Sequence, residues 1–348
     1  MGARRSATRT LETIDATLDE ACMGLALDAA TTARCRVSPR PWVGAVAITD
    51  DGRRFVGATE PVPGRHAESV ALDAARAAGA STAGATVYVT LEPCSHHGVT
   101  RPCADTLIEA RVRRVVAALA DPDPRVAGKG FERLQAAGVD VAVGTCGTAA
   151  AEQLAPYLHH RRTGRPFVVL KLAASLDGRT AAPDGTSRWI TGPAARADAH
   201  RLRAESDAVL VGAGTVRADD PELTVRLVAA ERQPLRVVLG RAPEGARVHP
   251  CLELDGDLPE VLDTLGSKGV MQLLVEGGPT VAGEFHRRGL VDRYVVYLAP
   301  VLFGGDDGRP LFAGAGAPTI ADVWRGRAVA VARLGDDIRV DLESGEDC

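Results

Sequence analysis

Two short stretches of this sequence carry side chains that could together hold a metal ion. The stretch "RHAESVALDA" contains His66 and, two residues later, Glu68. The stretch "LEPCSHHGVTRPC" contains Cys94 and Cys103, which are separated by eight residues. Imidazole nitrogens and thiolates are ligands that zinc prefers, and a catalytic zinc keeps three protein ligands and one open position for water. The residue types therefore predict a zinc site that makes a nucleophile from water near neutral pH.

The spacing within the two motifs divides the roles among their residues. Residues two apart on a helix do not share a face, so His66 and Glu68 are not expected to be equal ligands of one ion. We expect His66 to bind the metal and Glu68 to carry protons, as deamination of an aminopyrimidine requires. Cys94, at the end of a strand, and Cys103, at the start of the next helix, would supply two thiolates. This division predicts a zinc-dependent deaminase.

The deaminase interpretation depends on both motifs being present. On its own, "HAE" is most often the start of a surface helix, where an acidic residue is ordinary. The eight residues between the cysteines depart from the P-C-x-x-C spacing of zinc deaminases. His96 and His97 are interpreted as loop residues, one of which could touch substrate. Alternatives from other classes are a metal-stabilised scaffold without chemistry and a deaminase of nucleic acid.

Composition and charge limit the class of protein. The chain has 348 residues, enough for two domains, and is 45% hydrophobic and 25% charged, as in ordinary globular proteins. A net charge of −4 argues against a surface that coats nucleic acid. No apolar run approaches the roughly 20 residues needed to span a bilayer. The seven cysteines, an odd number spread over the chain, do not suggest a disulfide framework. We therefore expect a cytoplasmic protein without membrane or nucleic-acid partners.

The first half of the chain alternates strands with helices, which indicates an α/β sheet covered by helices. Asp50, Asp51 and Gly52 separate the first two strands and favour a hairpin. Residues 148–162 are expected to be helical, and the basic stretch "HHRRTGRP" at their end marks a domain boundary. The other expected helices are 15–33, 66–78, 103–110 and 129–137, and the expected strands are 43–49, 53–59, 85–91, 113–119 and 139–143.

The second half is expected to form another α/β domain with a site for an anion. In "LLVEGGPTVAGEF" a strand, a glycine pair and a helix follow one another, and a helix N-terminus favours a phosphate. The stretch "VGAGTVR" has Arg217 where a Rossmann fingerprint has its third glycine, so a Rossmann domain is not expected. The expected strands are 166–175, 207–212, 235–239, 271–275 and 291–304, with a β pair within 327–342, and the expected helices are 193–205, 258–267 and 279–288.

Several of these motifs together resemble one family. The stretches "HAE", "TLEPCSHHGVTRPC" and "ADPDPRVAGKG" resemble the deaminase half of the bifunctional RibD family of riboflavin biosynthesis, and "LKLAASLDGRTA", "SRWITG", "GTVRADDPELTVR" and "VEGGPT" resemble its reductase half. The resemblance extends from about residue 18 to 343. It implies an α/β chain with a cytidine-deaminase-like three-layer domain at 15–147, a linker at 148–164 and a dihydrofolate-reductase-like domain at 165–345.

The resemblance also implies two reactions on a small-molecule substrate. The first is zinc-dependent hydrolytic deamination of 2,5-diamino-6-(5-phosphoribosylamino)pyrimidin-4-one. The second is reduction of the ribose to a ribityl chain by NADPH. The cofactors implied are therefore Zn²⁺ and NADPH. A related enzyme of another pathway, acting on a different aminopyrimidine, is the alternative within the family.

The roles of individual residues follow from the same resemblance. His66, Cys94 and Cys103 would be the zinc ligands, and Glu68 the proton donor and acceptor. Asp219 would be the catalytic acid near the reacting carbon, although "ADDPEL" is also typical of a turn. Contacts with NADPH are implied for Ala173, Trp189, Gly277, Gly278, Pro279 and Thr280. Contacts with substrate are implied for Ser187, Arg203, Thr215, Asp219, Leu223, Arg226 and Glu276, of which Arg203 and Arg226 suit its phosphate.

Four loop positions depart from the pattern of the family. Arg40 and Asp123 each replace an asparagine, Val99 replaces a basic residue, and Arg101 replaces a proline. Arg40 or Arg101 could supply the positive charge that Val99 lacks, since arginine forks suit phosphate. These positions leave the exact deaminase substrate open. The oligomeric state is also open, although the apolar strand 294–302 could serve a homodimer interface.

Overall fold

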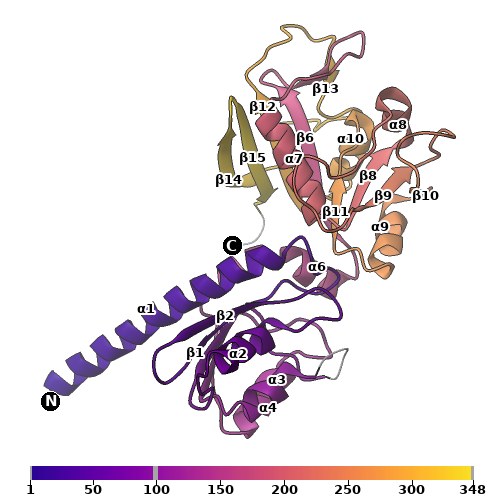
Figure 1. Ribbon diagram of the computed structural model, residues 1–348. Coiled ribbons are helices and arrows are strands. Elements are labelled where there is room, and N and C mark those ends of the chain that lie inside the picture. The colour runs from indigo at the N-terminus through magenta and orange to yellow at the C-terminus, as the bar shows by residue number, and fades with distance from the viewer. Residues whose placement is uncertain (1, 97–100, 346–348) are drawn as a thin grey trace. The chain divides into compact units, whose positions relative to one another are not determined.

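The computed structural model describes residues 2–96 and 101–345 and divides into two compact units (Figure 1). The first unit ends at Thr163 and the second begins at Gly164. This boundary falls within the basic stretch "HHRRTGRP". His97 and Val99 lie outside the described residues. In the described part of the chain, no helix has both the length and the apolar character needed to cross a membrane.

A five-stranded mixed sheet forms the centre of the first unit, in the order β2-β1-β3-β4-β5. Strand β1 (Gly44–Ile48) pairs antiparallel with β2 (Arg54–Ala58) and with β3 (Thr86–Val89). Strands β3, β4 (Arg114–Ala117) and β5 (Asp140–Val143) run parallel. The predicted hairpin and all five predicted strands are confirmed.

Helices cover both faces of this sheet, and two glycines let them approach closely. A Cβ on Gly44 would lie 1.8 Å from a backbone oxygen of α1 (Gly2–Ala33), and one on Gly57 would lie 2.2 Å from a backbone oxygen of α2 (Ala67–Ala77). Gly57 pairs with Ala45, the neighbour of Gly44, so the two glycines face opposite sides of the sheet. The predicted three-layer arrangement is therefore confirmed.

The segment expected to link the domains is itself folded within the first unit. It forms two short helices, and the indole Nε1 of Trp42 donates a hydrogen bond of 3.0 Å to the carbonyl oxygen of Gln153 at the end of the first. The hydroxyl of Tyr157, on the second, donates to Asp121 in the loop after β4. The remaining helices of the unit are α3 (Cys103–Glu109), α4 (Lys129–Ala136), α5 (Gly147–Gln153) and α6 (Ala155–Thr163).

The second unit is built on an eight-stranded sheet in the order β10-β9-β8-β11-β6-β12-β15-β14. The first six strands of this order, from β10 through β12, run parallel to one another. At the other edge β15 pairs antiparallel with β12, and β14 pairs antiparallel with β15. The strands are β6 (Phe167–Ser175), β8 (Ala208–Gly212), β9 (Leu235–Leu239), β10 (Leu252–Leu254), β11 (Gln272–Val275), β12 (Arg293–Ala299), β14 (Gly326–Leu334) and β15 (Asp337–Ser344).

Helices pack on this parallel sheet through apolar side chains. One core cluster of buried side chains joins Leu170, Leu210 and Leu273 of the central strands to Leu262 and Phe285 of two helices. Three of the four helices carry proline in their first turn, where a missing N–H group costs nothing. The helices are α7 (Pro193–Glu205), α8 (Ala213–Asp219), α9 (Leu258–Ser267) and α10 (Pro279–Arg287).

The structure differs from the sequence-based expectation at several short elements. Strand β12 was expected to continue to residue 304 but ends at Ala299, because Pro300 follows and has no N–H group for the ladder. It also lies between β6 and β15, so both of its backbone edges are already paired. The elements not predicted are α8, β10 and a two-stranded ribbon of β7 (Arg179–Ala181) and β13 (Arg309–Pro310).

Candidate active sites in the two units

The three expected zinc ligands meet at one point of the first unit. His66 lies immediately before α2, Cys94 follows β3, and Cys103 is the first residue of α3. Nδ1 of His66 lies 3.2 Å from Sγ of Cys103 and 3.6 Å from Sγ of Cys94, and all three atoms lie within 4.8 Å of one another. Tetrahedral zinc with bonds of about 2.0 and 2.3 Å holds nitrogen and sulfur about 3.5 Å apart. The donor set therefore fits zinc.

Backbone contacts hold the two cysteines in place. The backbone N–H of Cys103 donates to Sγ of Cys94 at 3.3 Å, and the N–H of Ala104 donates to the carbonyl oxygen of Cys94 at 3.1 Å. The hydrogen bond from the thiol of Cys103, opposed by burial, lowers the pKa of Cys94. The same contact, together with burial, raises the pKa of Cys103. The two thiols therefore share a hydrogen bond at the point where the three donor atoms meet.

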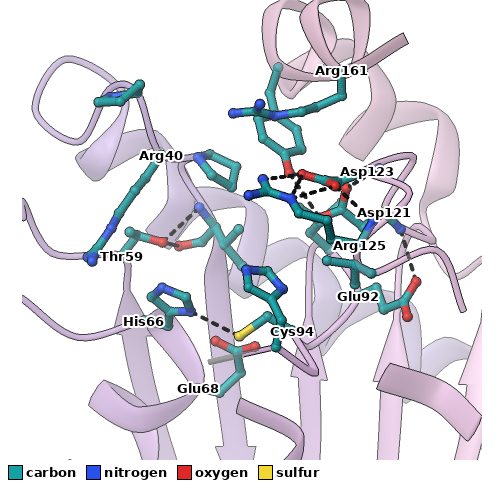
Figure 2. Close-up of a pocket in the computed structure, with 17 residues that line it drawn as sticks. Arg40, Thr59, His66, Glu68, Glu92, Cys94, Asp121, Asp123, Arg125 and Arg161 are labelled. Atoms are coloured by element: carbon teal, nitrogen blue, oxygen red, sulfur yellow. Dashed lines mark hydrogen bonds and ion pairs between the residues drawn. The ribbon is translucent and has the colours of Figure 1, made fainter. Parts of the chain in front are cut away.

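Glu68 lies buried beside these ligands without joining them. Its side chain projects from the first turn of α2 below His66 and Cys94 (Figure 2), and the residue is only 3% exposed. Burial raises the pKa of Glu68, and the nearby imidazole of His66 opposes that rise. A raised pKa brings a carboxyl group closer to the range in which it both accepts and donates protons near neutral pH. Glu68 is therefore a buried carboxyl with a raised pKa beside the three donor atoms.

His66, Glu68 and Cys94 form the floor of a pocket of about 230 Å³. Its opposite wall is made by charged residues from the loop after β4 and from α6, as Figure 2 shows. The lining residues are Pro39, Arg40, Pro41, Val43, Thr59, His66, Glu68, Leu91, Glu92, Cys94, His96, Asp121, Asp123, Arg125, Val126, Tyr157 and Arg161. A pocket with polar groups around a metal-binding floor is typical of an active site.

Glu92, which the sequence analysis did not single out, fixes the loop over this pocket. Its carboxylate accepts hydrogen bonds from the backbone N–H groups of Asp121, Gly128 and Gly130, at 3.1, 3.0 and 2.9 Å. Gly130 is required here, because a Cβ at this position would lie 2.0 Å from the carbonyl oxygen of Pro93. The stretch "ADPDPRVAGKG" is therefore anchored by a buried carboxylate.

The charged wall consists of two paired groups from different parts of the unit. Asp123 accepts hydrogen bonds from Nε and Nη2 of Arg125, at 3.0 and 2.6 Å, and this contact lowers the pKa of Asp123 to about 2. The carboxylate of Asp121 accepts from the hydroxyl of Tyr157 at 3.0 and 3.1 Å. Burial raises the pKa of Asp121. Both acids therefore already have partners in the protein.

The structure shows which of the two arginines, Arg40 or Arg101, could replace the basic residue that is missing at position 99. Both guanidinium Nη atoms of Arg101 bind the carboxylate of Glu109, and both side chains are exposed outside the pocket lining. Arg40 lines the pocket and donates through Nη1 to the carbonyl oxygen of Gly64 at 2.8 Å. Arg40 is therefore the better placed of the two.

In the second unit the expected site residues gather at the carboxyl ends of three adjacent strands. Ala173 lies in β6, Thr215 follows β8, and the loop 276–280 follows β11. The backbone N–H of Gly278 donates to Oγ1 of Thr215 at 3.2 Å. A Cβ on Gly277 would lie 2.5 Å from Cβ of Val281, so the turn before α10 needs glycine. Parallel sheets bind ligands at this edge.

A buried ion pair fills part of this edge. Nε and Nη2 of Arg203 bind the two carboxylate oxygens of Glu276, at 2.5 and 2.9 Å. Burial would raise the pKa of Glu276, but Arg203 holds it at about 2. Burial lowers the pKa of the neighbouring Lys171, and the negative charge of Glu276 partly opposes this decrease. Burial, with the charges of Arg203 and Arg226, lowers the pKa of His200 to about 4.

Other expected residues lie in exposed segments around the same edge. Trp189 is 70% exposed, with the guanidinium of Arg196 4.7 Å from its ring centroid. Asp219 is exposed at the end of α8, and its carbonyl oxygen accepts from Arg188. The structure therefore does not bring Asp219 into the buried cluster. Ser187 is half-buried, Leu223 is buried with a φ of 53°, and Arg226 pairs with Glu222.

A second group of possible metal ligands lies at the sheet edge of the second unit. Ligand atoms of His249, Cys251 and Glu253 lie within 4.8 Å of one another, on and beside the edge strand β10. Glu253 is already bound by Arg241 and by the backbone N–H of Ala242. This cluster is more exposed than the first, and its one carboxylate is already paired, so it does not resemble a catalytic site.

Comparisons with known proteins agree with both units. The "Cytidine and deoxycytidylate deaminase zinc-binding region" profile matches residues 16–119, and the "RibD C-terminal domain" profile matches residues 166–340. The riboflavin biosynthesis protein RibD of Mycobacterium tuberculosis (strain ATCC 25618 / H37Rv) is 46% identical over 339 residues, which are 93% of this chain and 97% of that relative.

Solved structures show the same similarity. RibD of Acinetobacter baumannii, form 1, matches with a TM-score of 0.88 and 37% identity over 95% of this chain and 100% of its own. A diaminohydroxyphosphoribosylaminopyrimidine deaminase/5-amino-6-(5-phosphoribosylamino)uracil reductase from Thermotoga maritima matches with a TM-score of 0.86 and 32% identity, over 95% and 99% of the two chains. These matches confirm the family that the sequence motifs predicted.

Proposed function

Because this chain belongs to the RibD family of riboflavin biosynthesis proteins, we propose which of its residues perform the two reactions of that family. The chain is a bifunctional enzyme, with a zinc-dependent deaminase and an NADPH-dependent reductase. The observation that carries the proposal is the convergence of His66, Cys94 and Cys103 beside the buried carboxyl of Glu68. The domain boundary is placed after α6, so that residues 148–163 complete the deaminase pocket.

In the deaminase, His66, Cys94 and Cys103 would hold the zinc ion. Zinc, when bound in such a site, lowers the pKa of water so that it can attack carbon near neutral pH. Glu68 accepts a proton from the attacking water and delivers one to the amino group that leaves as ammonia. Its burial keeps bulk water from exchanging that proton during transfer. Arg40 and the Asp123–Arg125 pair line the rest of the pocket and would orient the substrate.

In the reductase, the carboxyl edge of β6, β8 and β11 would hold NADPH and substrate together. NADPH supplies the hydride, and the protein supplies position and charge. The turn at Gly277 and Gly278 and the start of α10 at Pro279 and Thr280 suit a phosphate of the cofactor. Ala173 and Trp189 would contact the rest of the cofactor.

The substrate residues of the reductase surround the buried ion pair. When the substrate binds, Glu276 and Arg203 would give up part of the contact between them and bind the substrate instead. Asp219 would supply the acid near C1′ of the sugar. The other substrate contacts are assigned to Ser187, Thr215, Leu223 and Arg226.

A homodimer and a cytoplasmic location are finer parts of the proposal. The chain just beyond β12 exposes apolar side chains, with Leu302 70% and Phe303 38% exposed, and exposed apolar groups of this kind support self-association. The cysteines of the described residues are free thiols, which supports a reducing compartment. Light scattering of the purified chain tests the dimer, and a monomer at micromolar concentration would contradict it.

The proposal is tested by mass spectrometry of the diaminopyrimidine ribotide incubated with the zinc-loaded protein. Deamination replaces an amino group by oxygen and adds about one mass unit. With NADPH present, reduction adds about two more. Absence of the first shift, with zinc bound, would contradict the deaminase assignment and favour an enzyme for another aminopyrimidine.

A further inference from the structure

We propose that Arg161 of α6 recognises the phosphate of the deaminase substrate and so determines the preference of this pocket for a phosphorylated ligand. The inference rests on the proposed deaminase function and extends it to a residue outside both motifs. Arg161 lines the pocket on the wall opposite Arg40, above the floor formed by His66, Glu68 and Cys94 (Figure 2).

Tyr157 supports the guanidinium of Arg161 from one turn earlier on the same helix. The guanidinium carbon lies 5.1 Å from the centroid of the Tyr157 ring, within the range of a cation–π contact. The ring is itself fixed, because its hydroxyl donates to both carboxylate oxygens of Asp121. The guanidinium is therefore held in one place before any ligand binds.

The hydrogen-bonding capacity of Arg161 is not used within the part of the chain that the structure describes. Its Nε is buried and has no hydrogen-bond partner there, and no carboxylate lies within 4.0 Å of its guanidinium nitrogens. A buried donor without a partner is costly, so a site that retains one usually offers it to a ligand. Nδ1 of His96, also on the pocket lining, is another buried polar atom with no hydrogen-bond partner among residues 2–96 and 101–345.

The other arginines of the pocket are less available. Arg125 uses Nε and Nη2 to bind Asp123, which neutralises its charge. Arg40 uses Nη1 for the carbonyl oxygen of Gly64, on the other wall. Among these three guanidinium groups, Arg161 combines a fixed position with free donors.

The chemistry of the ligand follows from this geometry. The pyrimidine must reach His66 and Cys94 on the floor, so the phosphoribosyl group extends toward the walls. A phosphate monoester carries nearly two negative charges and accepts parallel hydrogen bonds from a planar guanidinium. Arg161 provides such a fork, and Arg40 provides a second positive charge from across the pocket. Together they replace the basic side chain that is absent at Val99.

The test compares Arg161→Met with Arg162→Met, which removes the same charge from the next, exposed position of α6. Deaminase kinetics are measured on the full zinc-loaded chain, with the diaminopyrimidine ribotide and with its dephosphorylated riboside. Loss of a charge-assisted contact predicts that kcat/KM of Arg161→Met for the ribotide falls about 10- to 100-fold, through KM. The riboside reaction of Arg161→Met, and both reactions of Arg162→Met, should change little.

Two other outcomes would overturn the inference. If Arg161 only neutralises Asp121 and Asp123, the variant would lose the ribotide and riboside reactions equally. If Arg161→Met behaves as the parent, Arg161 does not contact the phosphate. Zinc content and reductase turnover of the same chain show whether each unit remains folded.

Failure of the proposed function itself is distinguished by a binding measurement. Calorimetry with ribose 5-phosphate needs no deaminase turnover. The inference predicts that Arg161→Met no longer binds ribose 5-phosphate in the deaminase pocket, whereas Arg162→Met binds it as the parent does. Equal binding by both variants would overturn it even if the deaminase substrate proves to be different.

Discussion

The two units hold their polar site residues in opposite ways. In the first, His66, Cys94 and Cys103 point their donor atoms at one another around a common point, with few other partners. In the second, Arg203 and Glu276 saturate each other as a buried ion pair. The three donor atoms are held at one point by two helix starts and a loop. An anion site can be closed by an internal ion pair until a ligand exchanges with it.

The largest expected effect tests whether the first unit performs chemistry independently of the second. Glu68→Gln keeps the shape of the buried side chain and removes its proton transfer, so deamination should fall about 100- to 10,000-fold. Reduction of the deaminated substrate by NADPH should be unchanged. The matched control is Glu132→Gln, an exposed acid in the first turn of α4, which should leave both rates unchanged. A Glu68→Gln chain that still deaminates would support a scaffold role for the first unit.

The next effect tests the closed state of the second unit. Glu276→Gln leaves the buried charge of Arg203 without its partner, which should lower the free energy of unfolding of this unit by about 3–5 kcal/mol. Glu222 is a half-buried carboxylate that pairs with two exposed arginines, Arg226 and Arg247, and Glu222→Gln should cost about 1 kcal/mol or less. Urea denaturation followed by tryptophan fluorescence measures both, because reductase activity would also report the loss of substrate contacts. Equal, small effects would show that the ion pair is not the buried contact described here.

A smaller effect separates the two glycines of the loop after β11. In Gly277→Ala the new methyl group meets Val281, so the turn must shift at a cost of about 1–3 kcal/mol. In Gly278→Ala the methyl group lies 3.4 Å from Oγ1 of Thr215, an ordinary contact, and stability should change by less than about 0.5 kcal/mol. Thermal unfolding and the KM for NADPH should rank the variants in this order. The reverse order would contradict the assigned turn.

The smallest effect is a pH dependence of the second unit. The pKa of His200 is about 4 in the folded state and about 6.5 when unfolded, so between these values the unfolded chain binds more protons. Stability should therefore rise with pH from 4 to 6.5, by about 1–2 kcal/mol after allowance for solvent screening. Asn at this position can still accept from the N–H of Arg226 but does not titrate. His200→Asn should flatten this part of the profile, and an unchanged slope would assign it to other groups.

The first site could be predicted from sequence because its signals are local. His66 and Glu68 open a helix, and Cys94 and Cys103 lie at a strand end and a helix start, so each motif indicated its own position. The alternation of strands and helices likewise predicted both sheets. The zinc-ligand geometry then required only that these ends meet.

The charged wall of the pocket and the buried ion pair could not be predicted in the same way. Tyr157 meets Asp121 across 36 positions of sequence, and Arg203 meets Glu276 across 73. No periodicity or spacing encodes such contacts, and α6 was expected to belong to a linker. Very short strands such as β10 and β13 were missed because two or three residues show no pattern.

The central claim is that His66, Cys94 and Cys103 bind one zinc ion while Glu68 does not. Zinc per chain, measured by elemental analysis after a brief wash with chelator, tests it most directly. We expect one ion in the parent chain, in Glu68→Gln and in Cys251→Ser, which removes a ligand of the second cluster, and none in Cys94→Ser or Cys103→Ser. Zinc retained by both cysteine variants, or lost from Glu68→Gln in a folded chain, would contradict the account.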